Sequence, residues 1–236
     1  MKKYKIFVAC DSSNIKKVKE IIRKTKNSKI IIGYKFGLEF FYSKEGRKFI
    51  EKLKVKNLWL DTKIFDIPNT SFAAIKSLKD LKNISYITVH ISGGIEMLKA
   101  IKKATKKYNK KLKVLGVTIL TSFTNSSIKK VGHTKSVNDL VKKQVLLARN
   151  AKLDGVVCSA HEIKTVKKIS KRMEIITPGI RLKGDKLNDQ KRVSGPKEAF
   201  SNGATSIVIG RSITKNNIFI GYNRVYYKNI LQSTIL

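Results

Sequence analysis

The chain has 236 residues, 42% of them hydrophobic, and its 51 basic and 16 acidic residues give a formal net charge of +35. This length allows one large core, and the absence of any run of about 18 apolar residues argues against a membrane span. Only eight of the basic residues are Arg and the lysines are spread from end to end, which indicates a solvated basic surface and argues against specific nucleic-acid binding.

Short apolar runs, rich in Ile and Val and largely free of charge, recur along the whole sequence. Such runs are typical of strands that are buried on both faces of a parallel sheet. In chain order they cover residues 5–10, 29–37, 57–64, 85–91, 113–120, 154–159, 173–180 and 205–212. Lysine-rich stretches of helical period lie between them, for example at 14–26, 94–108 and 137–151.

This alternation predicts βαβ units, and eight of them in a chain of this length fit a single-domain (β/α)8 TIM barrel that spans residues 1–236. A doubly wound open sheet is the alternative. No linker or low-complexity segment interrupts the pattern. Active sites of barrels lie at the carboxyl ends of the strands, so the polar residues at those ends are the candidates for a site.

The expected strand ends are rich in polar residues. The chain has only eight Asp, yet three of them, Asp11, Asp61 and Asp66, lie at or just beyond these ends. The other polar or glycine residues there are Lys35, Lys63, His90, Ser92, Thr121, Ser122, Ser159, Arg181, Gly210 and Arg211. This clustering favours a polar site at the barrel mouth.

The stretch WLDTKIFDIPNT, residues 59–70, places a lysine between two carboxylates directly after an apolar run. Residues i and i+2 of a strand face the same side, so we expect Asp61 and Lys63 to project together. Lys35, on the neighbouring strand, is expected beside Asp61, which with Asp66 gives a Lys–Asp–Lys–Asp array. Carboxylates in such an array keep the lysines cationic, and a cationic lysine can donate a proton and stabilise negative charge. A structural ion-pair cluster that closes the barrel mouth is the alternative.

The last two expected strands indicate a phosphate site. Phosphate often binds at the loops after strands 7 and 8 of a barrel. Gly210 allows a close backbone approach there, and Arg211 offers a forked donor. Arg181 follows strand 7, and the polar stretch 181–192 is long enough to form a lid from which Gln190 reaches a phosphate. These residues alone indicate a phosphorylated small-molecule substrate.

Taken together, the motifs resemble those of the orotidine 5'-phosphate decarboxylase family over nearly the full length of the chain. WLDTKIFDIPNT is similar to the family's D-x-K-x-x-D-I-P-N-T signature. The other matching blocks, in the same order as in the family, are VACD, KFGLEFF, VTILTS, DGVVCSAHE, TPGIR, DQKRV and IVIGRSIT. The pattern is closest to the shorter bacterial branch.

The resemblance implies decarboxylation of orotidine 5'-monophosphate to UMP and CO2, the last step of de novo pyrimidine nucleotide synthesis, without a metal or a cofactor. It implies that Lys35, Asp61, Lys63 and Asp66 form the catalytic array. Lys63 matches the proton donor to C6 of the pyrimidine, and Asp61 matches the carboxylate that faces the substrate's own carboxylate.

The same resemblance implies the substrate contacts and a partner. Asp11 matches a ribose ligand whose contact Lys35 can share. Either Thr121 or Ser122 matches the contact to the pyrimidine. The phosphate end and its lid are matched by Arg181, Gln190, Gly210 and Arg211. Asp66 and Thr70 match residues that reach the site of the other subunit, which implies a homodimer with shared active sites.

Two other functions stay open at this point. Mg²⁺-dependent 3-keto-L-gulonate 6-phosphate decarboxylases share the barrel and D-x-K-x-x-D, but they use an acidic metal ligand on strand 2, where this chain has Lys35. A basic, non-enzymatic nucleic-acid-binding protein is favoured by the net charge alone.

The cysteines and the amino-terminal stretch bear on the compartment. Cys10 and Cys158 follow apolar residues and have no CxxC spacing, which predicts two buried, reduced thiols. The first apolar run is too short for a secretion signal. We therefore expect a cytoplasmic protein.

Overall fold

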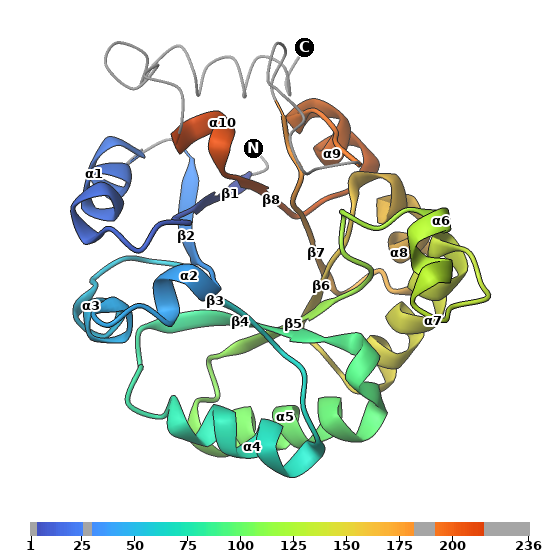
Figure 1. The fold of residues 1–236 in the computed structure, drawn as a ribbon, viewed down its shortest axis with the longest axis horizontal. Coiled ribbons are helices and arrows are strands. Elements are labelled where there is room, and N and C mark those ends of the chain that lie inside the picture. Colours follow the sequence, from blue (N-terminus) through green and yellow to red (C-terminus); the bar gives the residue numbers. More distant parts are fainter. Residues whose placement is uncertain (1–3, 26–29, 182–191, 215–236) are drawn as a thin grey trace.

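A computed structural model describes residues 4–25, 30–181 and 192–214 of the chain. Within these ranges eight parallel strands pair in sequence order, and β8 pairs back with β1 to close a barrel. Figure 1 looks down this barrel, with the strands in a central ring and the helices around it. The predicted TIM barrel is therefore confirmed, and a closed sheet excludes the open doubly wound alternative.

Each strand coincides with one of the apolar runs of the sequence. The strands are β1 (Lys5–Ala9), β2 (Ile31–Phe36), β3 (Leu58–Ile64), β4 (Ile84–His90), β5 (Lys113–Val117), β6 (Gly155–Val157), β7 (Glu174–Thr177) and β8 (Ser206–Ile209). The last four end before their apolar runs do, because apolar residues such as Ile119 and Ile180 are buried in loops at the barrel mouth instead of pairing in the sheet.

Helices and short helical turns connect the strands. They are α1 (Ile15–Thr25), α2 (Leu38–Phe41), α3 (Gly46–Lys52), α4 (Pro68–Ser77), η1 (Ile91–Gly93), α5 (Gly94–Tyr108), α6 (Asn125–Lys130), α7 (Val137–Asn150), η2 (Ala160–Glu162), α8 (Ile163–Ile169), α9 (Pro196–Asn202) and α10 (Arg211–Thr214). The long helices α1, α5 and α7 match the predicted stretches. Helix α1 shows the reason, since it buries Val18, Ile21 and Ile22 at helical spacing and leaves its lysines outside.

The core has two layers. One lies between the strands and the surrounding helices. The other fills the inside of the barrel, where Phe7 makes edge-to-face contacts with Trp59 and Tyr86, at ring-centre distances of 5.0 and 5.3 Å. Trp59 also lines the cavity at the barrel mouth. The inner layer thus forms an apolar floor beneath that cavity, to which Trp59 contributes the aromatic ring.

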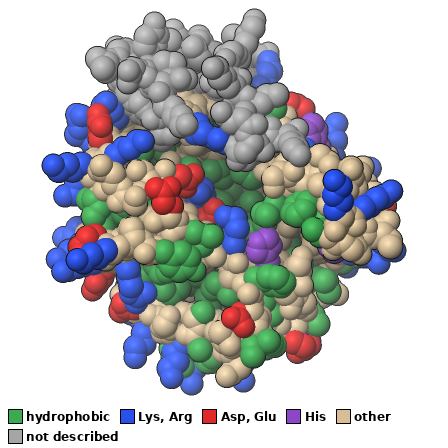
Figure 2. Space-filling view, in the orientation of Figure 1, with side chains coloured by type: hydrophobic (Ala, Val, Ile, Leu, Met, Phe, Trp, Pro, Cys, Tyr) green, Lys and Arg blue, Asp and Glu red, His purple; other side chains and the backbone are tan. Residues whose placement is uncertain are grey.

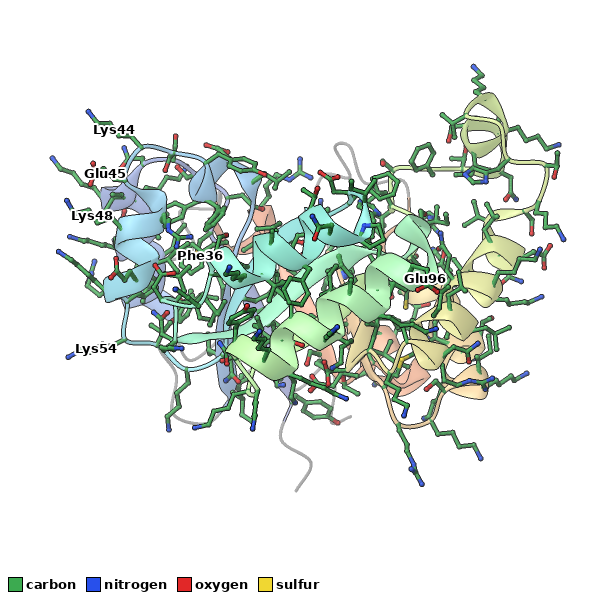
Figure 3. All side chains as sticks on the ribbon, turned by 90° about the horizontal axis from the view of Figure 1, so that it is seen from below. Phe36, Lys44, Glu45, Lys48, Lys54 and Glu96 are labelled. Carbon is green, nitrogen blue, oxygen red and sulfur yellow. The ribbon has the colours of Figure 1, made fainter. Side chains whose placement is uncertain are left out.

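The basic residues lie mostly on the outside of the barrel. In Figure 3 the side chains of Lys44, Lys48 and Lys54 point away from the fold, whereas Phe36 is fully buried inside it. None of the helices in the described ranges is both long and apolar enough to cross a membrane. The two cysteines are free and buried, as the sequence predicts.

Candidate active site

The mouth of the barrel contains a cavity of about 300 Å³. Figure 2 shows a hollow at the centre of the molecule in which side chains of both charges meet beside hydrophobic ones. Nine of the predicted site residues line the cavity, namely Asp11, Lys35, Asp61, Lys63, Thr121, Ser122, Arg181, Gly210 and Arg211. Asp66 and Thr70 do not line it. Gln190, with residues 182–191 of the expected lid, lies outside the described residues.

Strand β3 does not run regularly through the site. Leu60 pairs with Ile87 and Ile64 pairs with Val89, so β3 advances by four residues while β4 advances by two. Within this bulge Lys63 has a φ of 49°, in the left-handed region that side-chain-bearing residues seldom adopt. Asp61 and Lys63 project together as the sequence predicts, but the regular i, i+2 alternation on which that expectation was based is interrupted. The bulge turns the side chains of Asp61 and Lys63 into the mouth.

Three elements bring an array of charges together above the apolar floor. The Nζ atom of Lys63 lies 2.9 Å from Oδ2 of Asp61, and the Nζ atom of Lys35 lies 3.2 Å from the same oxygen. Lys35 also donates a hydrogen bond of 3.0 Å to Oδ1 of Asp11, just beyond β1. Lys35 comes from β2, and Asp61 and Lys63 come from β3. The sequence therefore correctly predicts the pairing of these charges across two strands.

Opposite charges outweigh burial in this array. Burial alone would raise the pKa of the Asp61 carboxyl, but the ammonium groups of Lys35 and Lys63 and a hydrogen bond from Thr88 lower that pKa to about 2. Burial alone would lower the pKa of Lys35, but the carboxylates of Asp61 and Asp11 raise it to about 12. Asp61 and Lys35 are therefore both ionised throughout the neutral pH range.

Two residues of β4 complete the surroundings of the array. Thr88, which the sequence gives no reason to single out, donates a hydrogen bond of 2.8 Å to Oδ1 of Asp61. His90 is half-buried beside the ring of Phe65, and burial together with the nearby Lys63 ammonium lowers its pKa. A neutral imidazole at neutral pH adds no third cation to the mouth.

Asp66 and Thr70 lie apart from this array. Both are exposed, and among the described residues no ion pair of Asp66 is found. The Asp66 carboxylate accepts a hydrogen bond of 2.7 Å from the backbone N–H of Ile67, one residue before α4 begins at Pro68. A groove beside the cavity runs from Lys63 to Asp66 and Thr70. Within one chain, Lys35, Asp61 and Lys63 of the predicted array therefore lie together with Asp11, and Asp66 does not join them.

Three of the predicted phosphate residues line the same cavity. Arg211 is the first residue of α10, and Arg181 follows β7 after Gly179. The backbone of Arg181 is fixed by a hydrogen bond of 3.0 Å from its N–H to the carbonyl oxygen of Ser194. Arg181, Gly210 and Arg211 thus line the same cavity as the charged array.

A residue that the sequence analysis did not identify holds the segment with Thr121 and Ser122. The Arg192 guanidinium pairs with the buried carboxylate of Glu162 and donates hydrogen bonds of 3.3 and 3.0 Å to the carbonyl oxygens of Ile119 and Leu120. Thr121 and Ser122 follow directly and both line the cavity, several residues beyond the end of β5. The expectation that they end that strand is therefore wrong.

The site combines an anion between two cations, an apolar floor and two arginines. Such an arrangement can orient an anionic, phosphorylated substrate and protonate a carbanion formed at the lysine side. Among the residues that the structure describes, no three or more His, Cys, Asp or Glu side chains gather where they could hold a metal ion.

Comparisons with known proteins agree on one family. The model of the orotidine 5'-phosphate decarboxylase / HUMPS family matches residues 4–217. Orotidine 5'-phosphate decarboxylase of Fusobacterium nucleatum is 39% identical over 218 residues, which is 91% of this chain and 90% of that protein. The enzyme of the same name from Carboxydothermus hydrogenoformans is 40% identical over 216 residues, covering 89% and 88% of the two chains.

The fold gives the same result. A crystal structure of orotidine 5'-phosphate decarboxylase from Lactobacillus acidophilus superposes with a TM-score of 0.82 at 28% sequence identity. The superposition covers 99% of this chain and 100% of that chain.

The lowered pKa of Asp61 predicts a specific pH dependence of stability. The carboxylate contributes stability above the ordinary Asp pKa of 3.8, and the contribution is lost as the pH falls towards the folded-state pKa of about 2. Relative to Asp61→Asn, the native chain should therefore lose about 2 kcal/mol of unfolding free energy between about pH 5 and pH 2. Urea unfolding of both proteins across this range measures the difference, and a constant difference would contradict the assignment.

Proposed function

The chain belongs to the orotidine 5'-phosphate decarboxylase / HUMPS family, and we propose that the charged array at its barrel mouth performs the decarboxylation of orotidine 5'-monophosphate to UMP and CO2. As a member of this family the chain is a decarboxylase of the pyrimidine pathway. The observation that carries the proposal is the position of the Lys63 ammonium, 2.9 Å from Asp61 and on the edge of the cavity.

Lys63 supplies the proton. Loss of CO2 breaks the bond between C6 and the carboxyl carbon, and the bonding electron pair stays on C6 as a carbanion. A lysine ammonium next to C6 stabilises this developing charge and then protonates the carbon, which gives UMP. Lys63 lines the cavity and its ammonium group is paired with Asp61, which supports this role.

Asp61 acts on the other side of the bond that breaks. Its carboxylate faces the substrate carboxylate, and repulsion between the two favours departure of CO2. The ammonium group of Lys35 keeps Asp61 ionised and, with Asp11, binds the ribose hydroxyls. Either Thr121 or Ser122 contacts the pyrimidine, and both line the cavity. The phosphate binds to Arg181, Gly210 and Arg211, and Gln190 is a further proposed phosphate ligand. Binding there supplies energy used at C6.

The functional unit is a homodimer with shared active sites. Asp66 and Thr70 are exposed in one chain, and they line the groove that continues from Lys63. The exposed apolar side chains of Phe65 and Ile67 flank them, and Tyr42 lies on the same groove. Such a patch indicates a protein partner. A second copy of the chain, related by a two-fold axis, would cover these residues and receive Asp66 in its own site.

The alternatives receive less support. Lys35 occupies the strand position at which a Mg²⁺-dependent sugar-phosphate decarboxylase would need an acidic ligand, and its ammonium would repel the metal ion. No observation favours a nucleic-acid-binding role over a solvated lysine surface. We infer a cytoplasmic location from the two free thiols, because free cysteines are typical of a reducing compartment.

We expect the purified chain to consume orotidine 5'-monophosphate, seen as loss of its ultraviolet absorbance, and to do so equally in the presence of EDTA. Lys63→Ala should reduce kcat by at least about 10²–10⁴-fold, because general acid catalysis and charge stabilisation are both removed. Lys48→Ala, on the outer surface, is the matched control and should keep full activity. Near-native turnover by Lys63→Ala would disprove the proton-donor role, and inhibition by EDTA would favour the metal-dependent alternative.

Arg211→Ala should weaken phosphate engagement. Loss of a charged, forked contact costs about 1.5–3 kcal/mol, which lowers kcat/KM by about 10- to 150-fold. Orotidine without its phosphate serves as the control substrate. Its turnover should be unchanged by the substitution. An equally large loss with both substrates would show that Arg211 has a structural role instead.

The shared site predicts complementation. Lys63→Ala and Asp66→Asn are prepared as separate, nearly inactive proteins, and are then unfolded, mixed and refolded together. About half of the dimers are hybrids, and each hybrid has one intact site, so about a quarter of native activity should return. Lys63→Ala with Asp61→Asn is the control pair, because both residues serve the same chain's site and mixing should restore nothing. No recovery in the first mixture would reject the shared site.

A further inference from the structure

Thr88 lies at the middle of β4, directly opposite the bulge of β3. It falls between Ile87 and Val89, which pair with the two residues that bound the bulge. The side chain has no exposed surface, and it is absent from the lining of the cavity. It therefore cannot touch a substrate, and any effect on the reaction must act through its neighbours.

The hydroxyl group of Thr88 contacts both catalytic residues of β3. It donates a hydrogen bond of 2.8 Å to Oδ1 of Asp61, and it accepts one of 3.2 Å from the backbone N–H of Lys63. The carbonyl oxygen of Leu60 is farther away, at 3.4 Å. A hydroxyl has one proton to donate, and the shorter contact to an ionised carboxylate takes it.

The hydrogen bond from Lys63 N–H to Thr88 compensates for a backbone group that the bulge leaves without a ladder partner. The bulge takes the backbone N–H of Lys63 out of the regular ladder between β3 and β4, and an unpaired N–H in a partly buried position is costly. A left-handed backbone at a residue other than glycine is strained, so it persists only when neighbouring contacts hold it. Thr88 provides the partner for this N–H.

The same hydroxyl fixes the orientation of the Asp61 carboxylate. Oδ2 is shared by the ammonium groups of Lys35 and Lys63, and Oδ1 is held by Thr88. Because each carboxylate oxygen has its own partners, the carboxylate cannot rotate about the Cβ–Cγ bond without losing a contact. Thr88 thus connects the side chain of Asp61 to the backbone from which Lys63 extends.

We propose that Thr88 is a positioning residue for the decarboxylation, in which one buried hydroxyl fixes the Asp61 carboxylate and the backbone of Lys63 relative to each other. The proposal rests on the function proposed above for Asp61 and Lys63. It assigns a role in the reaction to a residue that lies behind the site, on a different strand from the two side chains it orients.

The test compares three variants, two that change the side chain of Thr88 and one that changes a second buried threonine. Thr88→Val keeps the shape of the side chain and removes the hydroxyl, whereas Thr88→Ser keeps the hydroxyl and removes the methyl group. Thr177→Val is the matched control, because Thr177 is also a fully buried strand threonine but its hydroxyl has no hydrogen-bond partner among the residues that the structure describes. Turnover of orotidine 5'-monophosphate and binding of UMP are measured for each protein, with melting temperature as a check of the fold.

Thr88→Val should lower kcat by about 10- to 100-fold, because the lost hydrogen bonds to charged and strained groups act on the reacting geometry. KM and the dissociation constant of UMP should stay close to native values, which identifies a loss confined to the transition state. Thr88→Ser and Thr177→Val should both remain close to native in kcat.

Native kcat in Thr88→Val, or an equal loss in Thr88→Ser, would overturn the proposal, and so would a loss expressed only in KM. If Thr88→Val does not fold, Thr88→Ala and Thr88→Ser are compared instead, and the proposal requires that only Thr88→Ala loses turnover. A native chain that does not decarboxylate the nucleotide at all would refute the proposed function itself, which distinguishes that failure from failure of the role of Thr88.

Discussion

The rest of the site depends on the ion pairs and the hydrogen bond of the Asp61 carboxylate. Its side chain is 10% exposed, and a buried anion of this kind is tolerated only when several partners replace the lost water. Here two ammonium groups and one hydroxyl do so, and they come from β2, β3 and β4. The closed barrel brings these strands into register, so the charge arrangement is a consequence of the fold and also constrains it.

The large positive charge of the chain has a limited part in this chemistry. Its lysines lie mainly on the outer surface, where water and salt screen them over about 10 Å. Lys35 and Lys63 differ because both pair with the Asp61 carboxylate, and both line the cavity with Trp59. The positive potential of the whole surface favours the approach of an anionic nucleotide. In the proposed reaction, Lys35 and Lys63 are the lysines that act on the bound nucleotide.

Much of this could be predicted from the sequence, because the apolar runs are buried on both faces and their ends define the barrel mouth. Nine predicted residues line one cavity for that reason. The bulge in β3 could not be predicted, since nothing local in WLDTKIF indicates a left-handed lysine. Thr88 was missed because threonine is ordinary in a strand, and Arg192 was missed because its partner Glu162 lies 30 residues away. The role proposed for Asp66 in a shared site depends on a second chain.

The most direct measurement is an NMR titration of the Asp61 side-chain carboxyl carbon, in the native chain and in Lys35→Met. The account predicts that Asp61 in the native chain stays ionised well below the ordinary Asp range, with a midpoint at about pH 2. Removal of the Lys35 ammonium should move that midpoint upward, because burial then meets less opposing charge. A native midpoint near 3.8, or no movement in Lys35→Met, would contradict the claim that paired cations hold this buried anion in place.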